Sequence, residues 1–258
     1  MDITELKRIE DKRLARHPWE RARAGMVRFL VRHFKPESIK VLDIGSGDAF
    51  LLNTLRQNYI SKEYIGVDTA YDAGILKRLR DSGVPESIIL LDHLNSLKGN
   101  AEKADTCLLL DVLEHCEDDR ALLVEARNGE ISSEDSFFFI TVPAFQALFS
   151  GHDELLGHYR RYSRKQLSKL CRSADLRVIA SGYFFFSLIP ARYLQILREK
   201  LTRKKSRRSL DAWKGGELLA RIFYAILWAD SRCCYLLSRL GIHLPGLSAY
   251  AICRKQPS

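Results

Sequence analysis

The sequence predicts an α/β fold with a mostly parallel, seven-stranded sheet and helices on both faces. Four short apolar runs each finish near an aspartate, and segments with helical periodicity separate them. The four runs are Ile39–Ile44, Tyr64–Asp68, Ile88–Asp92 and Cys107–Asp111. Parallel strands that alternate with helices place their carboxyl ends along one edge of the sheet, where ligands bind. We therefore expect a ligand site at that edge.

Three later segments complete the predicted sheet. They are Phe137–Val142, which stops before Pro143, then 177–186 with a kink at Gly182, and finally Leu247–Cys253. Phe137–Val142 is strongly apolar, as expected for a strand that is covered on both faces. Helices are predicted at 47–57, 73–82, 118–127 and 163–171, the last with Ser163 as its N-cap.

We predict one domain over 1–258, with its core at 36–186 and 247–254. Helices fill residues 1–35: a charged helix over Met1–Arg16 and a second helix that begins at Pro18. Near the start of the second helix lie Trp19, Glu20 and Arg23. These three side chains either pack the helix against the sheet or close over a bound ligand.

A basic, amphipathic helical insertion is predicted at 187–246, before the last strand, with a basic linker at 202–209. The segment 191–258 holds 14 Lys and Arg against four Asp and Glu, while the whole chain has a net charge of +9. The rest of the chain is therefore close to neutral. Such asymmetry indicates an anionic partner for this quarter: membrane lipid, a phosphorylated substrate or nucleic acid.

The predicted helix at 215–240 has two different faces on a helical wheel. One face carries Lys214, Glu217, Arg221, Tyr224, Trp228, Arg232, Tyr235 and Arg239. The opposite face carries Leu219, Phe223, Ile226, Cys234 and Leu237. Aromatic side chains mixed with arginines suit a membrane interface, and an ordinary surface helix with one core face is the equal alternative. Asp230 falls within the apolar face and needs a partner, for which Arg192 or Arg198 is available.

The composition indicates a cytoplasmic protein. The first 20 residues are dense in charge, so no secretory signal is predicted. The six cysteines include no Cys-x-x-Cys pair, which favours reduced thiols and no zinc site. No segment approaches the ~20 apolar residues that span a bilayer. We therefore expect no transmembrane span, and at most peripheral binding at the inner membrane surface.

The first apolar run is followed by glycines at alternate positions. Gly45 and Gly47 lack a Cβ, so backbone can approach a ligand closely, and free N–H groups at the next helix start attract negative charge. Taken alone, this pattern also fits a turn without any ligand. Asp68, at the tip of the second run, stands where a carboxylate can hold a ribose diol by two hydrogen bonds.

This series resembles the class I S-adenosylmethionine-dependent methyltransferases, whose first motif reads Asp-x-Gly-x-Gly-x-Gly. The matching residues are Asp43, Gly45 and Gly47, with Ala49 at the third glycine position. The resemblance implies a Rossmann-like core with an antiparallel last strand and S-adenosyl-L-methionine as cofactor. A dinucleotide-dependent dehydrogenase is disfavoured, because Phe50 stands where its third glycine would lie and Asp48 would repel a pyrophosphate.

The resemblance also implies roles for individual residues. Asp43 and the turn formed by Gly45 and Gly47 would flank the methionine part of the cofactor. Asp68 would hold the ribose, and Asp92 would contact the adenine amino group. The residues implied to line the pocket after the fourth strand are Asp111, Leu113 and Glu114.

The segment 144–162, after the fifth strand, is rich in functional side chains. It resembles a type 11/23-like subset of these methyltransferases with a Pro-Ala…His-Asp…Gly-His-Tyr-Arg-Arg-Tyr signature, associated with bacterial cell-envelope, lipid-linked glycan and secondary-metabolite genes. The residues predicted to contact the acceptor are Pro143, Arg160, Arg161 and Tyr162. Arginines can hold a phosphate or carboxylate by paired hydrogen bonds, and the alternative is an ion pair that anchors the loop.

Methyl transfer to a hydroxyl benefits from a group that accepts its proton. The predicted catalytic residues are His152, His158 and His115, with Asp153 or Glu114 as an orienting carboxylate. A hydrogen-bonded structural histidine is the alternative for each. The same five side chains would also suit magnesium, manganese or zinc. Because the family rarely needs a metal, we predict none.

The sequence thus predicts an S-adenosylmethionine-dependent methyltransferase that acts on a small or lipid- or glycan-linked acceptor, with oxygen as the favoured atom. An RNA or protein methyltransferase that uses the basic C-terminal quarter is one alternative, although no aromatic platform for single strands is evident. A non-catalytic cofactor-binding or scaffold module is the other. The intact Asp43, Asp68 and Asp92 argue against it.

Overall fold

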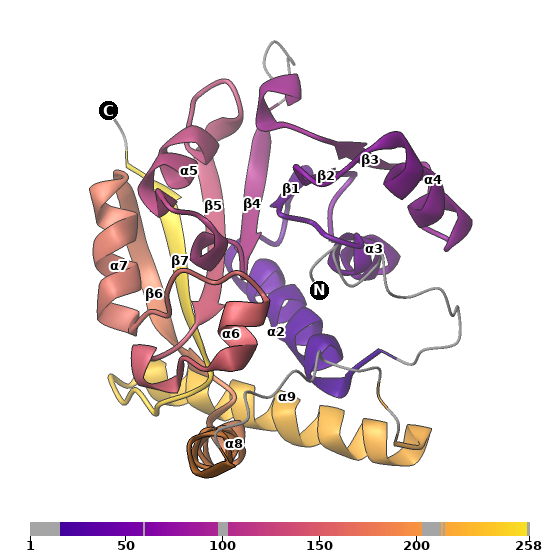
Figure 1. The fold of residues 1–258 in the computed structure, drawn as a ribbon. Helices are drawn as coiled ribbons and strands as arrows, with labels where there is room; N and C mark the ends of the chain where they lie inside the picture. Colours follow the sequence, from indigo (N-terminus) through magenta and orange to yellow (C-terminus); the bar gives the residue numbers. More distant parts are fainter. Residues whose placement is uncertain (1–15, 59, 98–102, 203–212, 214, 257–258) are drawn as a thin grey trace.

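A seven-stranded sheet lies at the centre of the molecule (Figure 1). This computed structural model describes residues 16–58, 60–97, 103–202, 213 and 215–256. The strands are β1 (Lys40–Ile44), β2 (Glu63–Val67), β3 (Ile88–Leu91), β4 (Ala104–Leu110), β5 (Ser132–Pro143), β6 (Leu176–Phe184) and β7 (Ser248–Lys255). Their order is β3-β2-β1-β4-β5-β7-β6, with β1 to β5 parallel and β7 antiparallel to both of its neighbours. The predicted α/β fold is confirmed.

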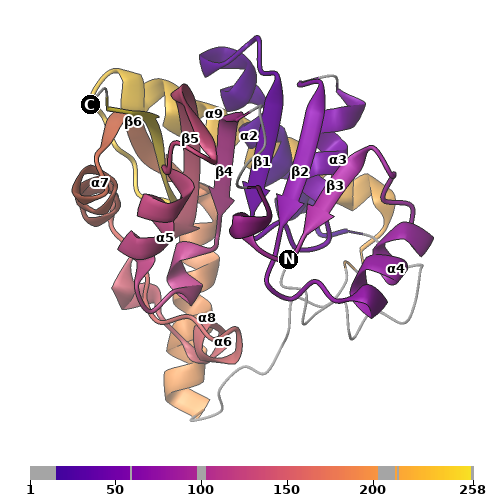
Figure 2. The same cartoon turned by 90° about the horizontal axis from the view of Figure 1, so that it is seen from above.

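Helices cover both faces of the sheet (Figure 2). They are α2 (Pro18–Phe34), α3 (Phe50–Gln57), α4 (Ala73–Asp81), α5 (Asp119–Ala126), α6 (Gly151–Leu155), α7 (Arg164–Ser173), α8 (Ile189–Thr202) and α9 (Glu217–Arg239). Short 3-10 helices are η1 (Leu94–Leu97), η2 (Leu113–His115), η3 (Gln146–Leu148) and η4 (Phe186–Leu188). One core cluster joins α2, α3, α4 and α9 to the sheet, and the other joins α5 and α7. Every residue of β1 and β4 is buried, which explains their continuous apolar runs.

Several predicted boundaries differ from the structure. Helix α3 begins at Phe50 and not at Gly47, because Gly47 and Ala49 both have φ of 56°, in the left-handed region that a helix cannot include. Strand β6 runs without a kink at Gly182, and its one irregularity lies between Val178 and Ala180. The predicted helix over Met1–Arg16 and the linker at 202–209 fall almost wholly outside the described residues.

The orientation of α9 differs in part from the prediction for its two faces, because the aromatic residues and Arg232 of the mixed face pack inward while Glu217, Arg221 and Arg239 stay exposed. In Figure 1 this helix crosses the lower part of the molecule beside α2, and the two helices are in contact. Tyr224 and Trp228 lie against Gly25 of α2, and the Arg232 guanidinium stacks 3.5 Å from the ring centroid of Phe29. Stacking of this kind allows the mixed arginine and aromatic face to pack inward.

Leu219, Phe223 and Ile226 of the predicted apolar face are exposed, whereas Cys234 is buried. Together with Leu218 and Ile222, these three side chains form the exposed apolar face of α9. Asp230 accepts hydrogen bonds from the backbone N–H and the hydroxyl of Ser187, at 3.1 and 2.9 Å, so neither Arg192 nor Arg198 is the partner shown for it. No helix in the described part of the chain is both long and apolar enough to cross a membrane.

A substitution at the centre of β2 tests how tightly the sheet is packed below the ligand edge. A Cβ added at Gly66 would lie 2.5 Å from Ser46 Oγ and 3.0 Å from methyl carbons of Leu52 and Leu90. We expect Gly66→Ala to lower the free energy of unfolding by about 1–3 kcal/mol, because the added methyl overpacks this core. Guanidinium unfolding measures the effect. Gly129→Ala is the matched control, since a Cβ there meets only Lys255 Nζ at 3.7 Å; equal stability of both variants would contradict the prediction.

Candidate active site

A cavity of about 950 Å³ opens at the carboxyl ends of the parallel strands. One end is lined by residues that follow β1, β2 and β3, and the other by residues of α6, α8 and the loop after α6. Trp19 and Arg23 of α2 and the residues after β4 complete the lining. Its volume is at the upper end of the range for ligand pockets, so the cavity is large enough for two small molecules.

The turn after β1 and the tip of β2 are joined by hydrogen bonds. The Asp68 carboxylate accepts one from the backbone N–H of Gly47 at 3.1 Å and one from that of Ala70 at 3.0 Å. Asp68 and Gly45 both line the cavity. Gly45 has φ of 73°, and a Cβ there would lie 2.4 Å from Val112, so only glycine fits where this turn passes the end of β4.

The cavity is not lined by four of the predicted cofactor residues: Asp43, Gly47, Asp92 and Leu113. Asp43 is buried within β1, and burial raises its pKa to about 7 although the charge of Arg23 acts in the opposite direction. Gly47 is buried within the turn, and its backbone N–H donates a hydrogen bond to the cavity-lining Asp68. Asp92 is exposed, and the cavity is lined beside it by His93 and the first residues of η1.

The segment after β4 contributes the central part of the wall. Asp111 lines the cavity, is ion-paired with Arg23 and accepts a hydrogen bond from Thr141 at 3.2 Å. Leu113 is fully buried in the core and does not reach the cavity. Glu114 lines the cavity although its residue is fully buried, and desolvation followed by the charge of Asp111 raises its pKa well above the usual range.

The far end of the cavity is organised by the buried carboxylate of Asp153. One oxygen lies 2.7 Å from Arg161 Nε and 3.0 Å from His158 Nδ1, and the other lies 2.8 Å from Arg192 Nη2. The backbone N–H of Ser150 donates a further hydrogen bond at 2.9 Å. The network therefore joins α6, the loop after it and α8.

The charge states within this network follow from its contacts. Burial alone would raise the pKa of Asp153, but the hydrogen bond from His158 and the charges of Arg161 and Arg192 outweigh it and hold that pKa well below its usual range. Asp153 is therefore ionised at neutral pH. His152 also lines the cavity, and burial together with the charge of Arg192 lowers its pKa, so its imidazole is neutral at pH 7.

The predicted acceptor contacts divide into two groups. Pro143 and Arg161 line the cavity. Arg160 instead donates hydrogen bonds to Asp119 and to a backbone carbonyl, and the Tyr162 hydroxyl lies 2.7 Å from the same Asp119 carboxylate. Neither of these two side chains lines the cavity, and the ion pair of Arg160 with Asp119 matches the loop-anchoring alternative that was predicted for the arginines.

Sequence reasoning missed Arg192 as a site residue. It was considered only as a partner for Asp230, yet it is 8% exposed, lines the cavity and pairs with Asp153, 39 residues away. The spacing of apolar residues along α8 does not indicate that Arg192 contacts Asp153. Trp19 and Arg23, in contrast, line the cavity as one of their two predicted roles requires, while Glu20 is buried against Arg16.

Comparisons with known proteins agree with this architecture. A family model described as a methyltransferase domain matches residues 18–181. The chain therefore belongs to this methyltransferase domain family, and its enzyme class is that of the S-adenosylmethionine-dependent methyltransferases. No sequence in a comparison with curated proteins matches the chain.

Solved structures show the same fold at low sequence identity. The [4+2]-cyclase SpnF superposes with a TM-score of 0.55 at 16% identity, covering 96% of this chain and 85% of that one. A Bacillus halodurans protein provisionally described as a methyltransferase gives 0.54 at 12%, with 90% and 98% covered. The methyltransferase domain of bacterial CtHen1-CN gives 0.53 at 14%, with 91% and 98% covered. Since one of the three is described as a cyclase, the fold by itself does not define the reaction.

The Asp153 network provides a test of how the far end of the cavity is held. Asp153→Asn removes the charge that compensates Arg161 and Arg192, each 8% exposed, and leaves these two buried guanidinium groups with neutral hydrogen-bond partners. We expect the free energy of unfolding at pH 7 to fall by about 3–5 kcal/mol. Denaturant unfolding is the measurement.

Asp135→Asn is the control for this variant. It breaks the ion pair with Arg254, in which the Asp135 side chain is 79% exposed, and should change stability by less than ~1 kcal/mol. Equal effects of the two substitutions would show that Asp153 does not hold the site together.

Proposed function

We propose that the protein transfers the methyl group of S-adenosyl-L-methionine to a hydroxyl oxygen of a small or lipid- or glycan-linked acceptor. The observation that carries this proposal is the division of one cavity into two chemically different ends. One end presents the backbone turn and Asp68, and the other presents His152, Arg161 and Arg192. A cofactor and an acceptor can therefore lie in the same cavity with their reacting groups near its centre.

The residues at the first end fit the proposed cofactor. Each carboxylate oxygen of Asp68 accepts one backbone hydrogen bond and keeps a further lone pair. The two oxygens can therefore accept hydrogen bonds from the two hydroxyls of a ribose. The absence of a Cβ at Gly45 allows close approach to the backbone. Cavity-lining Asp111 would supply negative potential to a bound sulfonium, and its ion pair with Arg23 limits that potential.

The second end fits proton removal from an acceptor. When bound, S-adenosyl-L-methionine supplies an electrophilic methyl group whose C–S bond breaks as the C–O bond to the acceptor forms, while the hydroxyl proton passes to a base. His152 is suited to be that base, because its lowered pKa leaves a free lone pair at neutral pH. Arg161 and Arg192 would orient an acceptor that carries a phosphate or carboxylate.

A lipid-linked acceptor is supported by the surface beside the cavity. Helix α8 lines the cavity with one side and exposes an apolar stripe with another. This stripe consists of Tyr193, Leu194, Leu197 and Leu201. Together with the exposed apolar face of α9 and the positive charge of 191–258, it suits adsorption to an anionic bilayer. Of the anionic partners predicted from the sequence, nucleic acid has no comparable support, since an apolar stripe does not suit a polyanion.

Titration calorimetry with S-adenosyl-L-methionine tests the cofactor half of the proposal. We expect binding by the wild type and a loss of affinity on the order of 100-fold in Asp68→Ala, which removes two charge-assisted hydrogen bonds. Asp81→Ala, at the exposed end of α4, is the control and should bind as the wild type does. A folded wild-type protein that binds no cofactor would overturn the proposal.

Transfer of a labelled methyl group into lipid-extract and sugar-phosphate pools then tests the acceptor half. His152→Ala should reduce label transfer at least ~100-fold while cofactor affinity is kept, because a general base typically contributes 10²–10⁴-fold. Label found on nitrogen or on RNA would contradict the proposed oxygen acceptor.

Vesicle flotation tests the membrane surface. We expect the protein to bind vesicles that contain phosphatidylglycerol, more weakly at high salt, and a Leu194→Glu/Leu218→Glu double variant to bind at least ~10-fold more weakly. Ile39→Glu is the matched control, because Ile39 is a 51% exposed apolar residue at the amino end of β1, away from the cavity. Unchanged binding by the double variant would refute docking through α8 and α9.

A further inference from the structure

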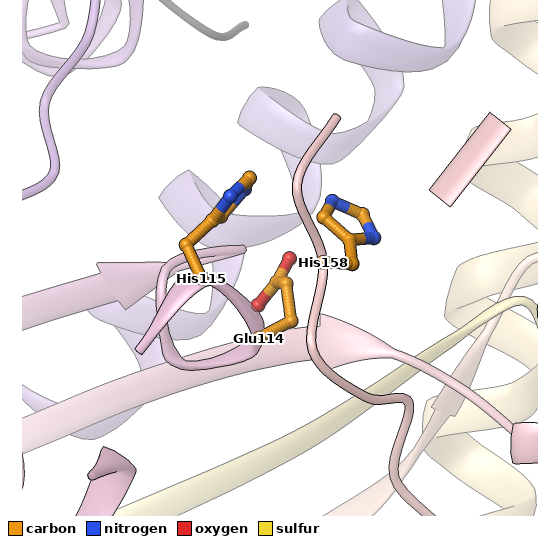
Figure 3. Close-up of side chains that lie close together, drawn as sticks. All are labelled: Glu114, His115 and His158. Atoms are coloured by element: carbon orange, nitrogen blue, oxygen red, sulfur yellow. The ribbon is translucent and has the colours of Figure 1, made fainter. Parts of the chain in front are cut away.

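Glu114, His115 and His158 line the cavity and lie close together. One ligand-type atom from each side chain lies within 4.8 Å of those of the other two, and Figure 3 shows these side chains grouped from two separate segments. The first two residues belong to η2, and the third follows α6. The two imidazole rings are 4.6 Å apart between centroids and almost perpendicular, at 87°. Metal bonds of about 2.1 Å separate adjacent ligand atoms by about 3–3.5 Å, so modest side-chain rotation brings all three onto one ion.

The Glu114 carboxylate is buried without a hydrogen-bond partner among the described residues. Its residue is 0% exposed, and neither carboxylate oxygen receives a hydrogen bond from any other residue that the structure describes. A carboxylate in such surroundings is unfavourable unless it is paired or coordinates a cation. The two arginines whose charges act on Glu114 already have other partners: Arg23 is ion-paired with Asp111, and Arg161 is bound to Asp153 and to the Ala144 carbonyl. A cation between Glu114 and the histidines would satisfy the carboxylate.

The orientation of His158 is fixed as expected for a ligand. Its Nδ1 lies 3.0 Å from the Asp153 carboxylate, which is itself held in place by Arg161 and Arg192. Because Nδ1 is engaged by this carboxylate, Nε2 is the ring nitrogen of His158 that can coordinate an ion. A carboxylate that orients a histidine in this way is the usual outer partner of metal-binding histidines.

We propose that Glu114, His115 and His158 bind one divalent transition-metal ion, of the class of Mn²⁺, Fe²⁺ or Zn²⁺. Two imidazole nitrogens and one carboxylate oxygen suit these ions, whereas Mg²⁺ prefers an all-oxygen shell. Three protein ligands leave open positions toward the cavity. If methyl transfer is the activity, as proposed above, an acceptor hydroxyl would bind there and lose its proton more readily. The proposal replaces the expectation of no metal from the sequence, and it excludes His152 and Asp153 as ligands.

Calorimetric titration of the chelator-treated, full-length protein with MnCl₂, ZnCl₂ and MgCl₂ tests the site without any acceptor. We expect one Mn²⁺ or Zn²⁺ per chain and much weaker binding of Mg²⁺. Glu114→Gln and His158→Ala should each weaken the affinity by at least ~100-fold, because loss of an outer partner alone typically gives 10–100-fold. His152→Ala is the matched control, a histidine in the same cavity that lies outside the cluster, and its metal affinity should equal that of the wild type.

The wild type alone supplies a second measurement, which is independent of how the variants fold. Cobalt(II)-loaded protein should show two paramagnetically shifted imidazole N–H proton signals, one for each histidine ligand. Absence of metal uptake by the wild type, unchanged affinity in folded Glu114→Gln and His158→Ala, or no shifted imidazole signals would each overturn the site. Cofactor binding by a metal-free protein would leave the proposed methyl transfer standing, so failure of the two proposals can be told apart.

Discussion

The buried carboxylate of Asp153 is the contact on which the far half of the cavity depends. It joins His158 and Arg161 of the loop after α6 to Arg192 of α8. Both arginines also donate to backbone carbonyls, Arg161 to Ala144 and Arg192 to Leu148. An ionised group inside a protein is tolerated only when its partners are close and well directed. The pairing therefore defines where α8 and the loop after α6 lie relative to β5.

Much of the fold could be predicted because its signals are local. The runs that became β1, β2, β3 and β4 are short, apolar and bounded by turns, so the alternation of strand and helix was evident. The faces of α9 were not predictable in the same way. Hydrophobicity alone placed Leu219 and Phe223 inward, but stacking of Arg232 and close contact of Trp228 with Gly25 turned the opposite face toward α2. Such pairings depend on a partner helix that a helical wheel does not include.

The candidate site could be predicted where the order of strands along the chain determines which residues lie together. Asp68 and Gly45 follow adjacent parallel strands, so they had to share an edge of the sheet. Glu114, His115 and His158 were named from the sequence, but their convergence required the loop after α6 to fold back along η2, where the Tyr159 N–H donates to the Glu114 carbonyl. No pattern in the sequence indicated a role for Arg192. Its ion pair with Asp153 joins residues 39 apart, and such a spacing does not follow from the periodicity of a helix or a strand.

The two walls of the cavity come from different stretches of the chain, with the turn and Asp68 in the first half and η4 and α8 in the second. Leu188, Ala191 and Gln195 face the cavity from this second wall. Changing their size reshapes one chamber without altering the backbone turn that faces the other. Directed evolution toward new acceptors can therefore concentrate on this one wall. A library limited to Leu188 and Ala191 leaves both Asp68 and the Asp153 network intact, whereas Gln195 accepts a hydrogen bond from Arg192 at 3.2 Å.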